Sequence, residues 1–371
     1  MQVSRYDYPA QFADLDATVD QIRRMLVNGS YILDETVQRF ENRFARYVGT
    51  RHAVGVNSGT DALILALRAL DIGPGDEVIT VANTFYASAL AITAVGAVPR
   101  LVDCRPDDHL MDLEQVHAAI GPRTRAVLAV HLFGKALPMA ALRALTDRHC
   151  LALIEDCAQA VGARSGTSRV GSFGHAGCFS FHPSKNLAAA GDAGAVVTSD
   201  DNLADRIRTL RNLGQQGQNN HVLRGVNSKL DALQALVLDH KLEHLDRWNE
   251  QRRTVAADYA ARLAAPPVRV TPAPDPEHVY HLYQVTVPAR DAVLTELCRR
   301  GVDAVVRYPV PIHRQPAFAD LGLGGDFPHA EHQARTTLCL PIRPNLSRPE
   351  RDHVVDSLRA ALTLQDVAAG R

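Results

Sequence analysis

Between residues 52 and 200, short apolar runs ending in polar residues or glycine alternate with Ala/Leu-rich stretches of helical periodicity. The pairs are HAVGVN with DALILALRAL, EVITVAN with YASALAITAVG, VPRLVD with LEQVHAAI, and RAVLAVHLFG with MAALRALTDRHC, followed by LALIEDC. Near-continuous hydrophobic strands that alternate with helices are typical of a parallel sheet covered on both faces. The pattern therefore predicts an α/β fold.

Two further apolar runs, GCFSF at 177–181 and GAVVTSD at 194–200, follow each other closely. Their short spacing predicts an antiparallel or hairpin-like return rather than another crossover. Residues 200–263 are mostly helical in pattern. The stretch 233–263 is long enough for one extended amphipathic helix.

A proline-rich break, APPVRVTPAPDPEH at 265–278, is the best candidate for a domain junction. Beyond it come a strand-like YHLYQVTVP, a helix-like DAVLTELCRRG, a strand-like DAVVRYPV and a closing helix SRPERDHVVDSLRAAL. We therefore expect a large α/β domain with the N-terminal segment over residues 1–250, and a small α+β domain over residues 251–371.

The charge balance narrows the range of partners. The chain has 40 basic and 41 acidic residues, a net charge of −1, which argues against a nucleic-acid or anionic-membrane partner. No uncharged apolar run approaches about 18 residues, and the N-terminus lacks the apolar core of a signal peptide. We expect a cytoplasmic protein with reduced cysteines. Neither the six scattered cysteines nor the histidine pairs have zinc-site spacing, so no metal is expected.

Only four of the 40 basic residues are lysines, namely Lys135, Lys185, Lys229 and Lys241, which leaves 40 − 4 = 36 arginines. A desolvated lysine can become a neutral nucleophile, whereas arginine stays protonated. Lys185 has the most apolar neighbourhood, because Phe179, Phe181 and Pro183 precede it. It is therefore the candidate for a lowered pKa.

Two other segments carry candidate chemistry. Asn57-Ser58-Gly59-Thr60 follows the first predicted strand and opens a helix, so its backbone N–H groups could bind an anion, although an ordinary capped helix is the commoner explanation of this motif alone. IEDCAQ at 154–159 brings Asp156 to a strand end, with Gln159 nearby. A structural ion pair is the alternative there. Neither a dinucleotide-binding G-x-G-x-x-G after the first strand nor a P-loop is present.

Taken together, these motifs resemble the fold type I pyridoxal-phosphate enzymes, and most closely the DegT/StrS-type sugar aminotransferases. The supporting stretches are GSYIL, HAVGVNSGTDAL, ANTFYASALAI, VHLFG, IEDCAQAVGA, SFHPSK, NSKLDALQA and RYPVPIHRQPAF. They occur in order over nearly the whole chain. Asp34 stands where the family usually has glycine after YIL.

The resemblance implies a pyridoxal 5′-phosphate cofactor joined to Lys185 as an internal aldimine. It also implies roles for individual residues: Asp156 at the pyridine nitrogen, Gln159 at the ring hydroxyl, Gly59, Thr60 and Ser180 at the phosphate, Phe85 stacked on the ring, and Asn227 at the phosphate of a neighbouring subunit's cofactor. The last role requires a homodimer with shared sites.

The function that the resemblance implies is transfer of an amino group from L-glutamate or L-glutamine to a nucleotide-linked keto-6-deoxy sugar. NSKLD at 227–231 favours a 3-keto sugar. The expected substrate-binding residues are Tyr31, Lys229, Tyr308, His313 and Gln315. The alternatives are an aminotransferase acting at C4, a sugar dehydratase, in which histidine would replace Lys185, and a non-catalytic cofactor-binding regulator.

Overall fold

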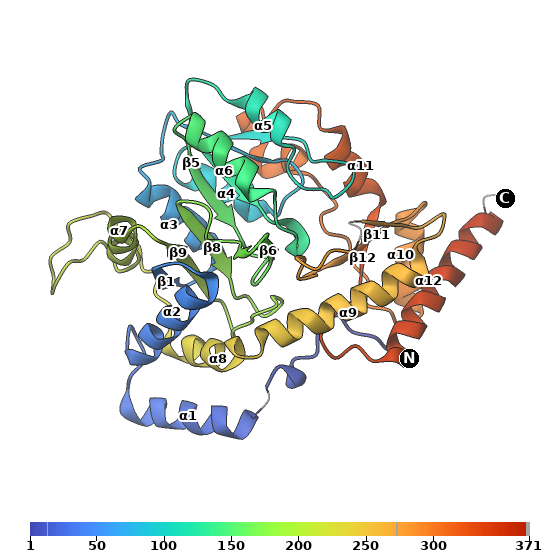
Figure 1. Ribbon diagram of the computed structural model, residues 1–371, viewed down its shortest axis with the longest axis horizontal. Helices are drawn as coiled ribbons and strands as arrows, with labels where there is room; N and C mark the ends of the chain where they lie inside the picture. The colour runs from blue at the N-terminus through green and yellow to red at the C-terminus, as the bar shows by residue number, and fades with distance from the viewer. Residues whose placement is uncertain (13, 272–273, 369–371) are drawn as a thin grey trace.

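A single seven-stranded sheet organises the larger part of the molecule, which is shown as a computed structural model in Figure 1. The structure describes residues 1–12, 14–271 and 274–368. The strand order is β1-β9-β8-β5-β4-β2-β3, and only β9 runs antiparallel to its neighbours. The strands are β1 (His52–Val56), β2 (Glu77–Val81), β3 (Val98–Val102), β4 (Thr124–Val130), β5 (Ala152–Asp156), β8 (Ala176–Ser180) and β9 (Gly194–Thr198).

Helices cover both faces of this sheet, as the sequence pattern predicts (Figure 1). Successive residues of β9 show this directly, because Val196 belongs to one buried cluster and Val197 to another. The helices of this part of the chain are α1 (Leu15–Asn28), α2 (Glu35–Val48), α3 (Gly59–Ala69), α4 (Tyr86–Ala94), α5 (Leu113–Ala119), α6 (Met139–Arg148) and α7 (Asp201–Arg211). Asp34, the departure from the family pattern, caps α2 by accepting the N–H groups of Thr36 and Val37.

The expected single helix over residues 233–263 is wrong. The structure has two helices there, α8 (Ala232–Leu242) and α9 (Leu245–Leu263), separated at Glu243 and His244. The break lets α8 pack against α2, while the later turns of α9 bury Val255 and Tyr259 in a separate core. The apolar pattern continues through the break, so periodicity alone could not reveal it.

A second, smaller sheet occupies the C-terminal part, with strand order β10-β11-β12. Its elements are β10 (Arg269–Thr271), β11 (Tyr283–Thr286), α10 (Arg290–Arg299), α11 (Pro328–Thr336), β12 (Thr337–Leu340) and α12 (Arg348–Ala368), and a small hairpin, β6 (Arg164–Ser165) with β7 (Ser168–Arg169), lies outside both sheets. The strand expected at DAVVRYPV is wrong, because Val305 forms only an isolated bridge with Cys339. Pro309, which lacks an N–H, could not donate to a ladder at the end of this segment.

The N-terminal segment packs against the C-terminal part of the molecule. Val3 bridges Val302 in parallel and lies in the same buried cluster as α10 and α12. The domain limits at residue 250 stay a prediction; that position falls inside α9. Among the described residues, no helix combines the length and the apolar character that crossing a bilayer requires.

Candidate active site

A cavity of about 370 Å³ opens where β1, β5 and β8 end. The carboxyl ends of parallel strands share one edge of a sheet, which is where α/β proteins bind ligands. Eight of the expected site residues line this cavity: Gly59, Thr60, Phe85, Asp156, Gln159, Ser180, Lys185 and Tyr308. Segments that are far apart in the sequence therefore form one wall.

Lys185 follows β8 in a tight turn, in which its backbone N–H donates to the carbonyl of His182 at 2.8 Å. Burial lowers the pKa of its amine to about 8, against an opposing effect of the Asp156 carboxylate. A lysine with such a pKa is largely protonated at neutral pH yet has an accessible neutral form. This is the property that an amine nucleophile and proton carrier requires.

Asp156 is the last residue of β5 and only 6% exposed. Its carboxylate accepts hydrogen bonds from the Ser88 hydroxyl at 2.8 Å and the Ala158 N–H at 3.1 Å. Burial nevertheless raises its pKa, although these two bonds and the charge of Lys185 act in the opposite direction. A cationic group bound in the cavity would stabilise the ionised carboxylate.

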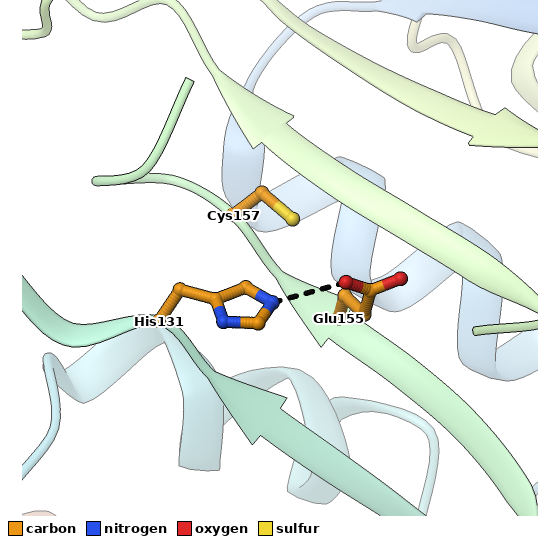
Figure 2. Close-up of side chains that lie close together, drawn as sticks. All are labelled: His131, Glu155 and Cys157. Atoms are coloured by element: carbon orange, nitrogen blue, oxygen red, sulfur yellow. Dashed lines mark hydrogen bonds and ion pairs between the residues drawn. The ribbon is translucent and has the colours of Figure 1, made fainter. Parts of the chain in front are cut away.

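Beside Asp156, the side chains of His131, Glu155 and Cys157 lie within 4.8 Å of one another (Figure 2). The lone pairs of His131 and Glu155 are already engaged. Glu155 accepts three backbone N–H groups, from Gly171, Phe173 and Gly174, as well as His131 Nε2 at 3.0 Å.

His131 Nδ1 accepts the N–H of Leu137 at 3.2 Å, so Nε2 carries the proton that is donated to Glu155. Neither histidine nitrogen is left to bind a metal ion. We therefore interpret this cluster as a buried support that holds the end of β5.

An anion-binding cradle forms where α3 begins. Ser58 caps this helix by accepting the N–H of Asp61 at 3.1 Å, so the N–H groups of Gly59 and Thr60 stand at its positive end. Ser180 closes the cradle from β8. A Cβ at position 59 would lie 2.5 Å from the Cβ of Ser180, so only glycine permits this close approach. The arrangement suits a phosphate group.

An aromatic pair forms the outer wall of the cavity. The Phe85 ring is 51% exposed and its centroid lies 5.4 Å from that of Tyr308. Gln159 links this wall to the sheet: its Oε1 accepts the Phe133 N–H at 2.6 Å and its Nε2 donates to the Tyr308 hydroxyl at 2.7 Å. Burial raises the pKa of Tyr308, which therefore keeps its proton.

Five expected residues lie outside this cavity within the single chain: Tyr31, Asn227, Lys229, His313 and Gln315. His313 Nε2 pairs with Glu331 at 3.1 Å, and Gln315 donates to the Val310 carbonyl.

The other three share one surface, because Tyr31 accepts the N–H of Ala232 and Lys229 donates to Asn227 Oδ1. Ser228, between Asn227 and Lys229, is buried, and its hydroxyl donates to the Asp61 carboxylate.

The cavity also contains residues that the sequence analysis did not single out. Tyr6 reaches it from the N-terminal segment, His281 from the residues before β11, and Arg307 from the segment before Tyr308. Ser88 supports Asp156 from α4. Only Arg307 had a signal in the sequence, since it directly precedes the expected Tyr308.

The lining fits pyridoxal phosphate. It offers a cradle that a side chain at position 59 would fill, a buried carboxylate that lacks a full counter-charge, and a lysine with a lowered pKa. Fold and cavity together define a fold type I pyridoxal-phosphate enzyme of the aminotransferase kind.

Comparison with known proteins supports this class and narrows it. Residues 14–359 match the profile of the DegT/DnrJ/EryC1/StrS aminotransferase family, and the chain belongs to that family. It is 48% identical over 357 residues to a dTDP-3-amino-3,4,6-trideoxy-α-D-glucose transaminase of Streptomyces venezuelae, with 95% of this chain and 94% of the relative covered.

Two further likenesses extend along the whole chain. A UDP-N-acetyl-3-dehydro-α-D-glucosamine 3-aminotransferase of Acidithiobacillus ferrooxidans is 43% identical, over 96% of this chain and 97% of its own. The crystal structure of Streptomyces venezuelae DesV in complex with a ketimine intermediate superposes with a TM-score of 0.93 at 46% identity, covering 97% of this chain and 98% of its own.

Proposed function

We propose that this protein uses pyridoxal phosphate to transfer an amino group from L-glutamate or L-glutamine to a nucleotide-linked 3-keto-6-deoxy sugar. The observation that carries the proposal is the pairing of Lys185 and Asp156 in one cavity beside an anion cradle. The C3 position is supported by relatives whose names specify 3-amino or 3-dehydro sugars.

In this proposal each cavity residue has a defined task. Lys185 binds the cofactor covalently, Gly59, Thr60 and Ser180 bind its phosphate, Phe85 packs on its ring, and Gln159 contacts its ring hydroxyl. When bound, pyridoxal phosphate supplies an electron sink for negative charge at the carbon next to the transferred nitrogen. Asp156 keeps the ring nitrogen protonated, which strengthens that sink.

Lys185 also moves the proton. Once the amine of the donor had taken its place, the neutral Lys185 Nζ would take the proton from the donor carbon that bears the nitrogen and return it to the carbon on the other side of that nitrogen. A pKa of about 8 suits this task, because an acid–base group works best when its pKa lies near the working pH. The aromatic wall of Phe85 and Tyr308 helps to exclude water.

We further propose a homodimer with shared active sites, in which Asn227 reaches the cofactor phosphate of the partner subunit. In support, Tyr31 and Ile32, which pair with the chain just after Lys229, are 47% and 50% exposed, and Leu26 and Val27 of α1 are 59% and 81% exposed. An exposed apolar surface of this kind is typical of an interface.

Subunit exchange tests this arrangement. Mixing inactive Lys185→Ala protein with an inactive Asn227→Ala variant should restore part of the activity, because hybrid dimers contain one intact site. A lack of recovery, with exchange confirmed by differently tagged subunits, would contradict the shared site. In the proposed dimer, the sugar is bound by Tyr31 and Lys229 of one subunit and by Tyr308 of the other. His313 and Gln315 support Tyr308 from the same segment.

The position on the sugar is tested in the reverse direction. Nucleotide-linked 3-amino and 4-amino sugars are offered with 2-oxoglutarate, and glutamate formation is followed. Preferential consumption of the 4-amino isomer would favour the C4 alternative and leave the aminotransferase assignment unchanged. A cofactor absorbance band that shifts on adding an amino acid distinguishes the enzyme from a protein without cofactor chemistry. Lys185 itself argues against the dehydratase, in which histidine would replace it.

We place this activity in the cytoplasm. All six cysteines are unpaired thiols, four of them buried, which suits a reducing compartment.

A further inference from the structure

One cation of the cavity has no task in the proposed reaction. Arg307 follows the isolated bridge between Val305 and Cys339, which fixes the start of its segment to β12. The next residue, Tyr308, is held by Gln159. Arg307 is therefore anchored on both sides, and it lines the same cavity as Lys185.

The guanidinium of Arg307 forms no hydrogen bond or ion pair with any side chain or carbonyl in residues 1–12, 14–271 and 274–368. Two buried arginines elsewhere in the protein have partners for their guanidinium groups. Arg211 pairs with Glu41 at 2.5 Å, and Arg252 donates to the carbonyls of Tyr280 and Ile342 at 3.1 Å. A cavity-facing arginine without such a partner is available to a ligand.

The charge of Arg307 acts at the reacting end of the cavity. It adds to burial in lowering the pKa of Lys185, and it also lowers the pKa of His281, for which burial, Lys185 and Arg252 are the larger causes. Both groups line the cavity. Arg307 therefore stands close enough to the amine of Lys185 for the two positive charges to repel each other.

We propose that Arg307 binds the α-carboxylate of the amino donor, so that it selects α-amino acids over other amines. This inference rests on the proposed aminotransferase function. A guanidinium presents paired N–H donors that match the two oxygens of a carboxylate. The donor's amine must take the place of the Lys185 amine, and its carboxylate is attached to the carbon that bears this amine.

The alternative anion is the diphosphate of the nucleotide sugar. That group is attached to C1 of the sugar, so ring atoms separate it from the C3 carbon that receives the amine. An anion contact beside Lys185 therefore fits the amino acid better. Because the two substrates react in separate half-reactions, the choice between them can be tested.

The experiment uses the holoenzyme and follows each half-reaction by the absorbance of the cofactor. In the first, L-glutamate is compared with 4-aminobutyrate, which lacks the α-carboxylate. We expect Arg307→Gln to raise the apparent dissociation constant for glutamate roughly 10- to 100-fold, and to reduce the preference for glutamate over 4-aminobutyrate by a similar factor. Arg307→Lys keeps the positive charge but lacks the paired N–H donors of a guanidinium. It should therefore recover part of the affinity for glutamate and part of the preference over 4-aminobutyrate.

In the second half-reaction, the aminated enzyme reacts with the nucleotide-linked 3-keto sugar. Its rate should stay within about threefold of wild type in Arg307→Gln. Arg299→Gln, a substitution of an exposed arginine on α10 that pairs with Glu296, serves as the matched control and should leave both half-reactions unchanged. A general disturbance of the cavity would instead slow all amines and the sugar together.

The outcomes separate the two proposals. If wild-type holoenzyme reacts with no amino acid, the proposed function is wrong and the inference falls with it. If wild type reacts and Arg307→Gln keeps its full preference for glutamate, only the inference is overturned. A variant that loses affinity for the sugar but not for glutamate would assign Arg307 to the diphosphate.

Discussion

Two lysines, Lys185 and Lys241, have similarly lowered pKa values in very different surroundings. Burial lowers both values to about 8. Lys185 opens onto the cavity and faces Asp156. Lys241, on α8, donates to the Ala188 carbonyl at 2.9 Å and to Gln11 at 3.0 Å, and its amine lies 4.3 Å from the centre of the Phe12 ring. A lowered pKa alone therefore does not identify a nucleophile; access to a ligand and a positioned carboxylate do.

The largest effect is expected at Lys185. Lys185→Arg removes the only cavity lysine, so turnover should fall by roughly four orders of magnitude or more. Lys241→Met and Lys135→Ala should keep turnover within about threefold of wild type. Borohydride reduction followed by peptide mapping checks the contrast, and cofactor label on Lys241 or Lys135 would show that we have chosen the wrong amine.

Asp156→Asn should retain the cofactor but lose roughly 10²- to 10⁴-fold in kcat, because a neutral amide does not stabilise a protonated ring nitrogen. The substitution preserves shape and the bond from Ser88 can persist, so thermal stability should change little. Steady-state kinetics and a cofactor titration measure the two effects separately. A near-normal kcat would mean that Asp156 is only structural.

Replacing Lys241 should change the pH dependence of the unfolding free energy rather than the rate of catalysis. Its pKa is about 8 in the folded protein and about 10.4 in an unfolded chain. Between these values the unfolded chain binds more protons, so the contribution of Lys241 to stability rises with pH across this window. Because only wild type gains this stability, the unfolding free energy of Lys241→Met minus that of wild type should fall by up to about 3 kcal/mol from pH 7 to pH 10.

Urea unfolding at several pH values measures that difference, and Lys185 cancels because both proteins contain it. A difference that does not vary with pH would indicate that Lys241 keeps an ordinary pKa.

Ser88→Ala should have the smallest effect. It removes a hydrogen bond that lowers the pKa of Asp156, so that pKa rises further. Activity requires the ionised carboxylate, and its loss on acidification should therefore begin about one pH unit higher. The acid limb of kcat against pH checks this. Thr295→Ala, on exposed α10, should leave the limb in place.

Sequence patterns could predict the sheet and the motifs at its edge, because strand ends of one sheet must converge. The family resemblance placed Gly59, Asp156 and Lys185 in one site, and the common edge of the sheet explains how they come together. What could not be predicted is where the chain changes direction. The break at Glu243 and His244 leaves no trace in the periodicity, because apolar residues on both sides are buried, although α9 leads into a different core.

The contributors from outside the large sheet were harder to foresee. Arg307 and Tyr6 lie in segments held by isolated bridges, Val305 with Cys339 and Val3 with Val302. Such single contacts have no period to detect. His281 precedes β11 by two residues, and its sequence spacing from His278 suggested a surface or core pair rather than a cavity wall.

The contact between the N-terminal segment and Val302 has a consequence for biosynthesis. Val3 finds its partner only when Val302 exists, and β11 lacks one edge until β12 emerges at Thr337–Leu340. On the ribosome, the sheet that carries Lys185 can be assembled long before these contacts. The N-terminal segment with Tyr6 has to wait, without its partner strand, until Val302 has been made, so the cavity is completed only after the large sheet.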